Sequence, residues 1–473
     1  MVFNSLTFIL FFIIVLVLHN LPFPWKVKKF NLLIASYIFY AAWSPPFVIL
    51  LWVATIIDWF AAQWMAKTED KRKRKRILLI SLVANLGMLG YFKYGNFLLA
   101  NFVSLMKFLG INYQPAEFNI ILPIGISFYT FVTLSYTIDV YRREIKPANS
   151  FLDYAMLITF FPHLVAGPIL RAAQFLPQCL EPKKANAQQL GWGWSLIVFG
   201  LFDKVVLADG VVAPVADAVY SMKGDVGSIQ AWLGSLAFTA QLFLDFNGYS
   251  LCAIGSALCL GFVFPDNFRF PYAAIGFSDF WTRMHISLSS WLRDYLYISL
   301  GGNKKGTLRT FFNLMITMLL GGLWHGATWH HVLFGGISGM LLVIERLLVG
   351  LFGAIAFFKT KIAKVGLMLL TFFVFNVSLV MFRSFGVENA LKMYKSMFTG
   401  ETVMIEPFSR PQAIGIIVVI AWLLITHWLL RDSSLEEAVS RLPWWGRSLI
   451  LALMILIIIL IPGESRAFVY FQF

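Results

Sequence analysis

Long apolar runs, separated by short charged segments, follow one another along almost the entire chain. The runs are continuous, so they lack the alternating segments of about ten residues that mark the strands of a membrane β-barrel. Most approach the roughly 17–25 residues with which a helix crosses a bilayer, and they cover residues 5–21, 31–43, 47–66, 77–92, 191–213, 229–247, 365–383, 413–430 and 447–462. The pattern predicts an all-α, polytopic membrane helix bundle of about 11–13 spans with additional re-entrant or interfacial helices.

Some apolar stretches are short or broken by helix-breaking residues. Pro123 and Gly125 interrupt one run near its start, and Pro162 and Pro168 flank His163. Freed backbone groups at membrane depth need partners, so such breaks lie against protein or a wet cavity. The simplest role for His163 is to satisfy the backbone of its broken helix. We expect tilted, bent or re-entrant segments within residues 95–108, 151–170 and 249–300.

Residues 278–298 are predicted to form one two-sided helix. Its apolar face carries Phe280, Met284, Leu288, Trp291 and Tyr295, and polar stripes beside it carry Asp279, Thr282, Arg283, His285, Ser287, Ser289, Ser290, Arg293 and Asp294. Such a helix lies in the membrane interface or lines a polar cavity.

Polar segments mark the predicted ends and connections of the spans. Asp245 and Asn247 are placed at the foot of the span 229–247, and Glu345 and Arg346 at the end of an apolar run. The residues read as connections are 265–272, 301–309, 384–411 and 431–446.

Composition and charge agree with a membrane protein. Of 473 residues, 59% are hydrophobic and 13% charged, whereas soluble domains carry about 25% charged residues. The net charge of +14 is explained by basic cytoplasmic loops, so no nucleic-acid partner is expected. Placing KVKK (26–29) and the basic run 67–76 in the cytoplasm, with two spans between them, puts the N-terminus outside. Cys179, Cys252 and Cys259 show no metal or disulfide spacing and are interpreted as core residues.

The first apolar run is expected to be a retained span. Residues 1–20 contain no basic n-region and no small-residue cleavage site, both of which a secretory signal peptide requires.

Three histidines near the start of the run 320–348 are the most unusual polar residues of the chain. His325, His330 and His331 lie in LGGLWHGATWHHVLFGGISG, where an ionisable group costs about 2.5 kcal/mol or more. His285 lies about forty residues upstream, in the polar helix. We predict that His325 and His285 share one buried site.

The residue types favour proton transfer over metal chemistry. His325 and His330 are five residues apart and do not share a helix face as a zinc pair would, so no metal site and no permanently bound cofactor are expected. Imidazole is suited to proton transfer near neutral pH, and burial keeps it neutral. Trp324 and Trp329 are expected to wall the site against water. The alternative is that His325 only hydrogen-bonds a neighbouring helix and that His285 is structural.

Two further features surround these histidines. Gly335 and Gly339 lie four residues apart in the helix after His325, a spacing that permits close helix packing. Asn303, Lys304 and Lys305 lie in a Gly-rich basic loop that is able to meet phosphate, although a cytoplasmic loop that obeys the charge rule explains it equally well.

Several long motifs resemble one family. PIGISFYTFVTLSYTIDVYRR, FFPHLVAGPI, LDFNGYS, NFRFPYAAIGFSDFWTRMHISLSSWLRDYLYISLGG, LLGGLWHGATW and the ending AFVYFQF are similar to the membrane-bound O-acyltransferase (MBOAT) family, in particular its bacterial branch that O-acetylates alginate or peptidoglycan. The resemblance covers residues 1–385 well and the last spans more loosely. Met284 stands where a Trp is expected, which keeps an apolar wall.

The resemblance implies a bundle with a central funnel or tunnel and an acyltransferase activity. The catalytic histidine of the family falls on His325 and its second active-site residue on His285; the expected substrate-binding residues are Trp324, Arg293, Asp294, Asn303, Lys304 and Lys305. One membrane domain spans 1–473, with N-terminal spans (1–120), an MBOAT core holding the active site (121–345) and C-terminal spans (346–473).

The same resemblance implies substrates, partners and a location. An acyl-CoA donor, expected to be acetyl-CoA, enters from the cytoplasm, and the acetyl group crosses a bacterial inner membrane toward a cell-envelope polysaccharide. The expected partners are a periplasmic SGNH-type transferase, the polysaccharide acceptor and membrane lipids. One rival hypothesis is a transporter or exporter of an envelope polymer. Many transporters consist of two related halves, and the chain shows none, which argues against this hypothesis. Another rival is a scaffold for envelope enzymes.

Overall fold

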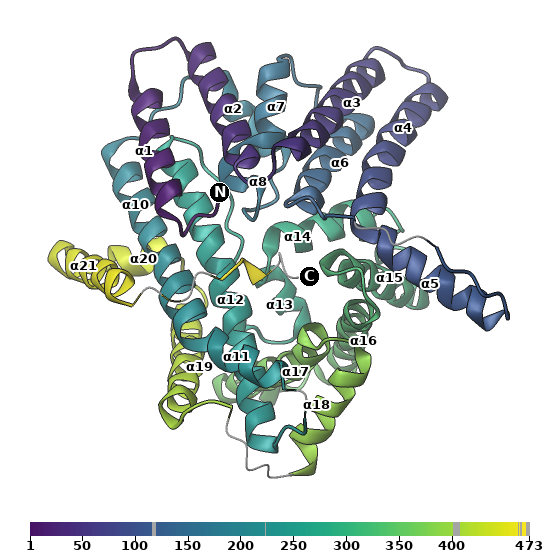
Figure 1. Ribbon diagram of the computed structural model, residues 1–473, viewed down its shortest axis with the longest axis vertical. Helices are drawn as coiled ribbons and strands as arrows, with labels where there is room; N and C mark the ends of the chain where they lie inside the picture. Colours follow the sequence, from purple (N-terminus) through teal and green to yellow (C-terminus); the bar gives the residue numbers. More distant parts are fainter. Residues whose placement is uncertain (116–119, 223, 401–406, 462, 464–465, 470–473) are drawn as a thin grey trace. The chain divides into compact units, whose positions relative to one another are not determined.

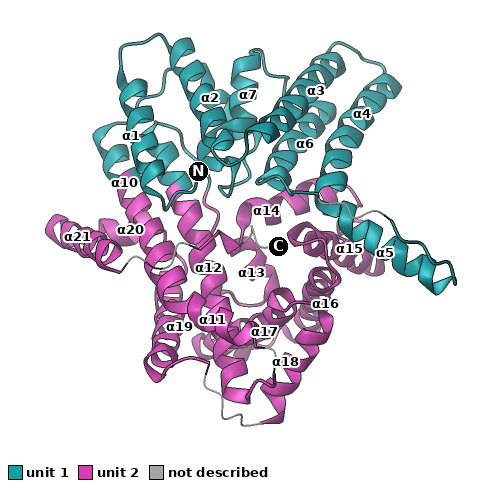
Figure 2. Ribbon diagram, viewed as in Figure 1, with its two compact units in different colours: residues 1–193, 253–265 teal, residues 194–252, 266–473 magenta. Residues whose placement is uncertain are grey.

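The chain is helical throughout the part that a computed structural model describes, which is residues 1–115, 120–222, 224–400, 407–461, 463 and 466–469. No β-strand occurs among these residues, so the all-α prediction is confirmed (Figure 1). The helices form two compact units: residues Met1–Gly193 with Ala253–Pro265, and residues Trp194–Cys252 with Asp266–Phe473 (Figure 2). The division at residues 120 and 345 stays a prediction.

The first unit holds the N-terminal helices. They are α1 (Leu6–Asn20), α2 (Trp25–Ala41), η1 (Pro45–Phe47), α3 (Val48–Ala66), α4 (Lys71–Leu89), η2 (Gly90–Tyr94), α5 (Gly95–Phe108), α6 (Ile126–Arg142), α7 (Phe151–Thr159), α8 (Phe161–Leu164) and α9 (Ala172–Leu180). α10 (Ala187–Leu201) and α12 (Ser228–Cys259) begin in one unit and end in the other.

The second unit holds the remaining elements. They are η3 (Phe202–Val212), α11 (Ala213–Tyr220), η4 (Pro271–Ala273), α13 (Phe277–Arg283), α14 (Ile286–Trp291), η5 (Leu292–Tyr297), α15 (Thr307–His325), α16 (Trp329–Phe352), η6 (Ala356–Lys359), α17 (Lys361–Arg383), α18 (Val387–Thr399), α19 (Arg410–Leu430), α20 (Leu435–Ser440) and α21 (Trp444–Leu460). The connections predicted at 384–411 and 431–446 therefore contain the helices α18 and α20.

Six helical segments among the described residues are long and apolar enough to cross a membrane. They are Pro45–Ala66, Lys71–Phe108, Ser228–Cys259, Trp329–Phe352, Lys361–Arg383 and Arg410–Leu430, and the shorter apolar helices are Leu6–Asn20 and Trp444–Leu460. This set supports a multi-pass membrane protein.

The predicted helix breaks are present in the first unit. α6 begins directly after Gly125, whose φ of +78° lies in the left-handed region that glycine tolerates. A Cβ at this position would lie 2.6 Å from the carbonyl oxygen of Leu164. Phe160 separates α7 from α8, which contains buried His163. The three cysteines are also buried, as expected.

Two basic segments read as loops are parts of helices. KVKK lies in the first turns of α2, and Lys29 is buried, where its ammonium pairs with Asp153 and donates to the carbonyl oxygen of Cys179 at 3.1 Å. Arg74, in the first turn of α4, is also buried and donates to the carbonyl oxygens of Val140 and Tyr141 at 3.1 and 2.7 Å. These two residues hold unit 1 together internally.

The predicted end of the span 229–247 was wrong. α12 is one helix of 32 residues, so this span continues to Cys259. Asp245 lies in its interior, 1% exposed, and not at the foot of a span. The nearby Asn247 donates to Asp203 Oδ2 at 2.8 Å. Partners from neighbouring helices allow these polar groups to be buried.

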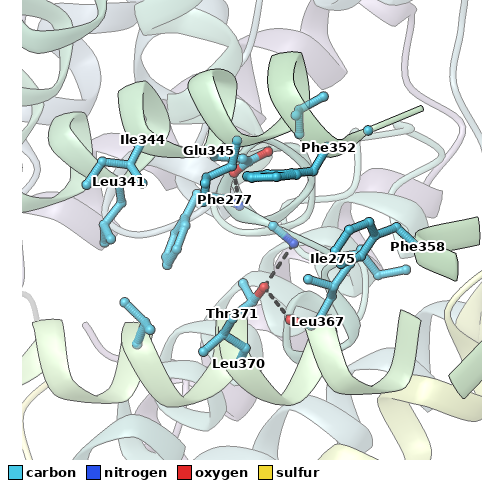
Figure 3. A pocket seen from close by; sticks show the side chains of 15 residues that line it. Ile275, Phe277, Leu341, Ile344, Glu345, Phe352, Phe358, Leu367, Leu370 and Thr371 are labelled. Carbon is cyan, nitrogen blue, oxygen red and sulfur yellow. Dashed lines mark hydrogen bonds between the residues drawn. The ribbon is translucent and has the colours of Figure 1, made fainter. Parts of the chain in front are cut away.

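Glu345 does not end a helix, because α16 continues to Phe352. Its carboxylate accepts a hydrogen bond from the backbone N–H group of Phe277 (Figure 3). It also accepts one from Ser278 N–H, so both donors lie at the start of α13. A carboxylate at a helix N-terminus satisfies donors that have no partner within the helix. The acidic residue therefore attaches α13 to α16.

The predicted helix 278–298 is broken in the middle. α13 ends at Arg283, α14 begins at Ile286, and η5 continues as a π-helix. Met284 is extended and His285 has a left-handed backbone. The polar and apolar stripes therefore do not run along one surface.

Glycines join α15 to α16 as an antiparallel pair, as the spacing of Gly335 and Gly339 predicts. A Cβ at Gly335 would lie 2.3 Å from the carbonyl oxygen of Met318, and one at Gly322 would lie 2.3 Å from that of His331. Only residues without a side chain permit this approach. The pairing fixes the C-terminal end of α15, where His325 is located.

Substitution of Gly335 tests this packing. Gly335→Ala forces α15 and α16 apart, and we expect it to lower stability by about 1–3 kcal/mol, the usual cost of overpacking. The measurement is the fraction of monodisperse protein that remains after heating in detergent. Gly366→Ala in α17 is the matched control, because an added Cβ there has nothing within 4 Å. Equal heat tolerance of the two variants would contradict the packing argument.

Candidate active site

The backbone of His285 is held in an uncommon conformation. Its φ of +46° and ψ of 55° lie in the left-handed region, which costs a non-glycine residue about 1–3 kcal/mol. Hydrogen bonds on both sides impose it: Arg269 N–H donates to Arg283 O, and Ile286 N–H donates to Asn267 O, both at 2.9 Å. The loop before η4 therefore binds the turn between α13 and α14 and determines where the imidazole points.

The side chain of Asn267 fixes the proton position on His285. Its Oδ1 accepts from the Ser287 hydroxyl at 2.8 Å and from Ser287 N–H at 3.4 Å, while its Nδ2 donates to Ser250 Oγ at 3.0 Å. Because a backbone N–H only donates, this orientation of the amide is set. The same Oδ1 lies 3.2 Å from His285 Nδ1, so Nδ1 carries the hydrogen and Nε2 is the basic nitrogen.

His285 is kept neutral by its surroundings. It is 2% exposed, and it lies outside the six candidate spans. The ring of Phe246 meets it edge-on, with centroids 4.5 Å apart. Burial lowers the pKa of His285 to about 3, since the charged form loses its hydration. At neutral pH, Nε2 therefore accepts hydrogen bonds.

The structure brings His285 and His325 to the same indole ring. The ring centroid of Trp324 lies 5.9 Å from that of His285 and 5.2 Å from that of His325. Trp324 and His325 are both buried. Two imidazoles, one from the turn between α13 and α14 and one from the end of α15, thus flank one aromatic side chain.

The aromatic wall around His325 differs from the one predicted. Trp329 is 56% exposed, so it does not close the site. Phe334 from α16 and Phe382 from α17 take its place, with centroids 6.3 and 5.5 Å from the His325 ring. Three helices therefore shield His325 from bulk water.

The other two histidines of this region close the turn between α15 and α16. His331 Nδ1 lies 2.7 Å and His330 Nε2 3.1 Å from the hydroxyl oxygen of Thr328. The His331 ring also packs where a Cβ at Gly326 would lie. These contacts indicate a structural role.

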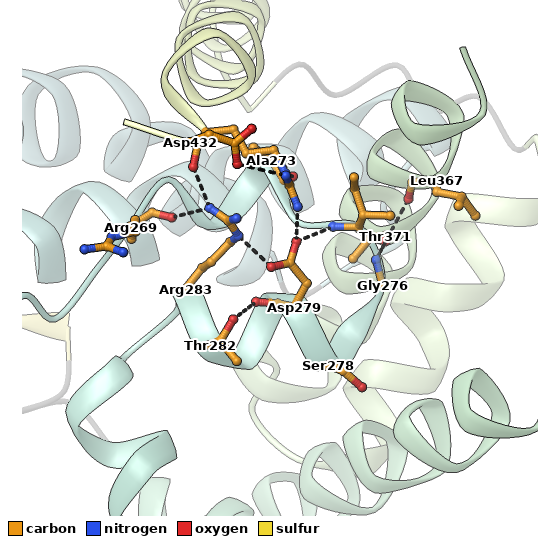
Figure 4. Close-up of polar contacts among 12 residues, drawn as sticks. Arg269, Ala273, Gly276, Ser278, Asp279, Thr282, Arg283, Leu367, Thr371 and Asp432 are labelled. Atoms are coloured by element: carbon orange, nitrogen blue, oxygen red, sulfur yellow. Dashed lines mark hydrogen bonds and ion pairs between the residues drawn. The ribbon is translucent and has the colours of Figure 1, made fainter. Parts of the chain in front are cut away.

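A carboxylate at the start of α13 fixes this helix. Asp279 accepts from Ile275 N–H at 2.9 Å, from Arg283 Nε at 2.8 Å and from Arg431 Nη2 at 2.8 Å (Figure 4). Burial opposes ionisation of Asp279, but the hydrogen bonds from Ile275, Arg283 and Arg431 outweigh it and lower its pKa below the ordinary value. Since α13 ends two residues before His285, this cluster positions the turn that carries the imidazole.

Of the predicted polar substrate-binding residues, Asn303, Lys304 and Lys305 lie apart from the histidines. Arg293 pairs with Asp294 at 2.8 Å on an exposed surface. Asn303, Lys304 and Lys305 are exposed in the turn before α15. α15 rises about 27 Å from its first residue to His325, so this basic turn lies at the opposite end of the helix.

Sequence reasoning missed a buried ion cluster behind the site. Lys204 Nζ lies 2.9 Å from Asp209 Oδ1 and 2.8 Å from Asp245 Oδ1, and all three are nearly fully buried. Asp245 Oδ2 also accepts from Val469 N–H at 2.7 Å. A lysine inside the run 191–213 was a signal that could have revealed it. No comparable signal marks Asn267, because its buried position depends on partners that only the folded structure brings together.

The chain's ending packs beside this cluster. The Phe468 ring lies 5.3 Å from that of Phe246 and 4.5 Å from that of Tyr249. Phe246 in turn contacts His285. The start of AFVYFQF is thus part of the core, and its residues 470–473 lie outside the described residues.

Known proteins are similar to this chain over most of its length. The family model of the membrane-bound O-acyltransferase family matches residues 76–385. The probable alginate O-acetylase AlgI of Pseudomonas aeruginosa is 39% identical, over 94% of this chain and 84% of that protein. AlgI of Pseudomonas putida is 38% identical over the full length of both chains. The peptidoglycan O-acetyltransferase of Helicobacter pylori is 34% identical, over 82% of this chain and 76% of that protein.

The family match covers more than half of the chain and contains both histidines, His285 and His325. The relatives that are named as acetylases of two different polymers extend the likeness to the rest of the sequence. The helical fold and its six candidate spans agree with both findings. The chain therefore belongs to the membrane-bound O-acyltransferase family and is a multi-pass membrane acyltransferase.

Proposed function

We propose that this protein is an O-acetyltransferase of a bacterial inner membrane. It takes an acetyl group from acetyl-CoA at the cytoplasmic face and passes it across the membrane for O-acetylation of a cell-envelope polysaccharide such as alginate or peptidoglycan. The observation that carries the proposal is the contact of His285 and His325 with one buried indole. The two polymers are those named for its relatives.

His325 is the general base of the proposed reaction. A ring nitrogen of His325 takes the proton of the acceptor hydroxyl as the hydroxyl oxygen attacks the thioester carbonyl carbon. The new C–O bond forms, a tetrahedral oxyanion follows, and the C–S bond then breaks. The imidazolium of His325 returns the proton to the leaving thiolate, so the enzyme ends in its starting state.

His285 orients the acceptor. Because Nδ1–H is directed to Asn267 Oδ1, a neutral His285 has no second N–H to offer a developing oxyanion. Its Nε2 instead accepts a hydrogen bond from a second donor group of the acceptor, which places the attacking oxygen and leaves the single hydrogen of the attacking hydroxyl to His325. This assignment favours acceptor positioning over oxyanion stabilisation for His285, and Trp324 holds both rings.

In this proposal, the exposed basic residues bind the acyl donor before the reaction. Lys304, Lys305 and Arg293 attract the phosphates of a CoA thioester, with Asn303 and Asp294 beside them. The distance of about 27 Å along α15 requires an extended donor arm between this turn and His325.

An outer partner completes the transfer. We propose that a periplasmic SGNH-type transferase receives the acetyl group and delivers it to the polysaccharide. The proposed chain of transfer needs no metal and no permanently bound cofactor, because each step is a proton transfer or an acyl transfer.

Replacement of His325 tests the reaction. In purified protein with labelled acetyl-CoA, the wild type should release free CoA and label an acceptor, and His325→Gln should lower the rate about 10²–10⁴-fold. His330→Gln is the matched control, because His330 contacts Thr328 and lies outside the proposed site. Full activity of His325→Gln would refute its role. Movement of polymer without thioester consumption would favour an exporter.

Replacement of Asn267 tests the tautomer. Asn267→Leu removes the acceptor of the Nδ1 hydrogen and should lower the acyl transfer rate about tenfold or more, whereas Asn267→Asp keeps an acceptor. A carboxylate raises the pKa of the neighbouring imidazole. As the pH falls, Nε2 in Asn267→Asp therefore becomes protonated, and stops accepting a hydrogen bond, at a higher pH than in the wild type. The acidic limb of the pH–rate profile should therefore move to higher pH. Identical profiles in all three proteins would show that Asn267 only supports the fold.

A further inference from the structure

An apolar groove of about 490 Å³ separates α16 from α17 in the second unit. Both helices are candidate membrane spans, and all groove residues belong to one unit. Its apolar lining includes Ile344, Leu348, Phe352, Phe358, Leu367 and Leu370 (Figure 3). Most of these side chains are exposed, so the groove opens at the surface of the two spans.

The polar atoms at the floor of the groove already have partners. The Glu345 carboxylate accepts from the N–H groups of Phe277 and Ser278. The Thr371 hydroxyl accepts from Gly276 N–H at 2.9 Å and donates to Leu367 O at 2.7 Å. Because these groups bond to the protein, the groove offers its occupant an apolar surface, which suits a hydrocarbon chain.

The length of the groove matches one leaflet of a bilayer. Its lining on α16 runs from Leu341 to Phe352, which is about 16 Å of helix. Half of a hydrocarbon core about 30 Å thick is about 15 Å. A lipid chain that enters from one membrane surface therefore fills the groove to its end.

One end of the groove is strongly basic. Lys364 lies three residues before Leu367 and so shares its face of α17, and Lys361 lies one further turn toward the start of the helix. Lys359 follows Phe358, which lines the groove. All three lysines are exposed, and the sequence contains no Asp or Glu between Glu345 and Glu388. The charge at this end is therefore positive without compensation from nearby sequence.

We propose that this groove binds a membrane phospholipid with an anionic headgroup. One acyl chain lies between α16 and α17, and the phosphate lies against Lys359, Lys361 and Lys364. Basic clusters at the membrane surface attract anionic lipids, and the apolar lining retains the chain. The site is separate from the two histidines and does not depend on the proposed reaction.

Native mass spectrometry of the full chain tests the proposal. The protein is equilibrated with equal amounts of phosphatidylglycerol and phosphatidylcholine, and the lipid that stays bound is counted. We expect phosphatidylglycerol to be retained at least about fivefold better. K359Q/K361Q/K364Q should remove this preference, while K71Q/K73Q/K75Q, a matched triple change of exposed lysines in α4, should keep it.

A second variant separates chain insertion from charge attraction. Leu370→Trp fills the groove but leaves the lysines in place, so it should lose the retained lipid. Equal retention of the two lipids by the wild type would overturn the proposal, whatever the variants do. Unchanged retention of phosphatidylglycerol by Leu370→Trp, in protein that elutes as a folded monodisperse species, would overturn the placement of the chain.

Discussion

The left-handed backbone of His285 is the constraint on which the site depends. Two backbone hydrogen bonds, from Arg269 to Arg283 and from Ile286 to Asn267, hold it. An uncommon conformation persists only where the surroundings over-determine it, and here α13 is fixed from several sides. Glu345, Thr371 and Arg431 each bind its first turns or the residues just before them. The strain of one residue is thus supported by α16, α17 and the residue that follows α19.

Buried charges extend this support to the end of the chain. Lys204 bridges Asp209 and Asp245, and Asp245 also binds the backbone of Val469. Removal of one partner from such a cluster costs about 3–5 kcal/mol, because the remaining charge is left buried. Phe468 then packs on Phe246, the same ring that meets His285. The polar core and the candidate site are therefore one packed structure.

The features that could be predicted from the sequence are those in which a residue type is unusual for its surroundings. Histidines in an apolar run and glycines four residues apart stand out, so the pairing of His325 with His285 and the packing at Gly335 were predictable. The break at His285 was not, because Met284 and Leu288 keep a helical spacing and only the partners in residues 267–269 end the helix.

The prediction for the buried basic residues was wrong for a related reason. Lys29 and Arg74 resemble loop residues that obey a charge rule, and only tertiary partners show that they are core groups. Trp329 was expected beside His325, but one turn of helix does not decide which face meets a neighbour. Phe382, which takes that place, comes from a helix more than fifty residues downstream.

The central claim is that His285 and His325 act on one substrate in one site. A double-mutant cycle of single-turnover acetyl transfer measures this directly, because residues that act as a unit show non-additive effects. If the claim holds, His285→Ala/His325→Ala will be no more than about tenfold slower than His325→Ala alone. If the two separate defects multiply in full in the double variant, the histidines act independently and the shared site is contradicted.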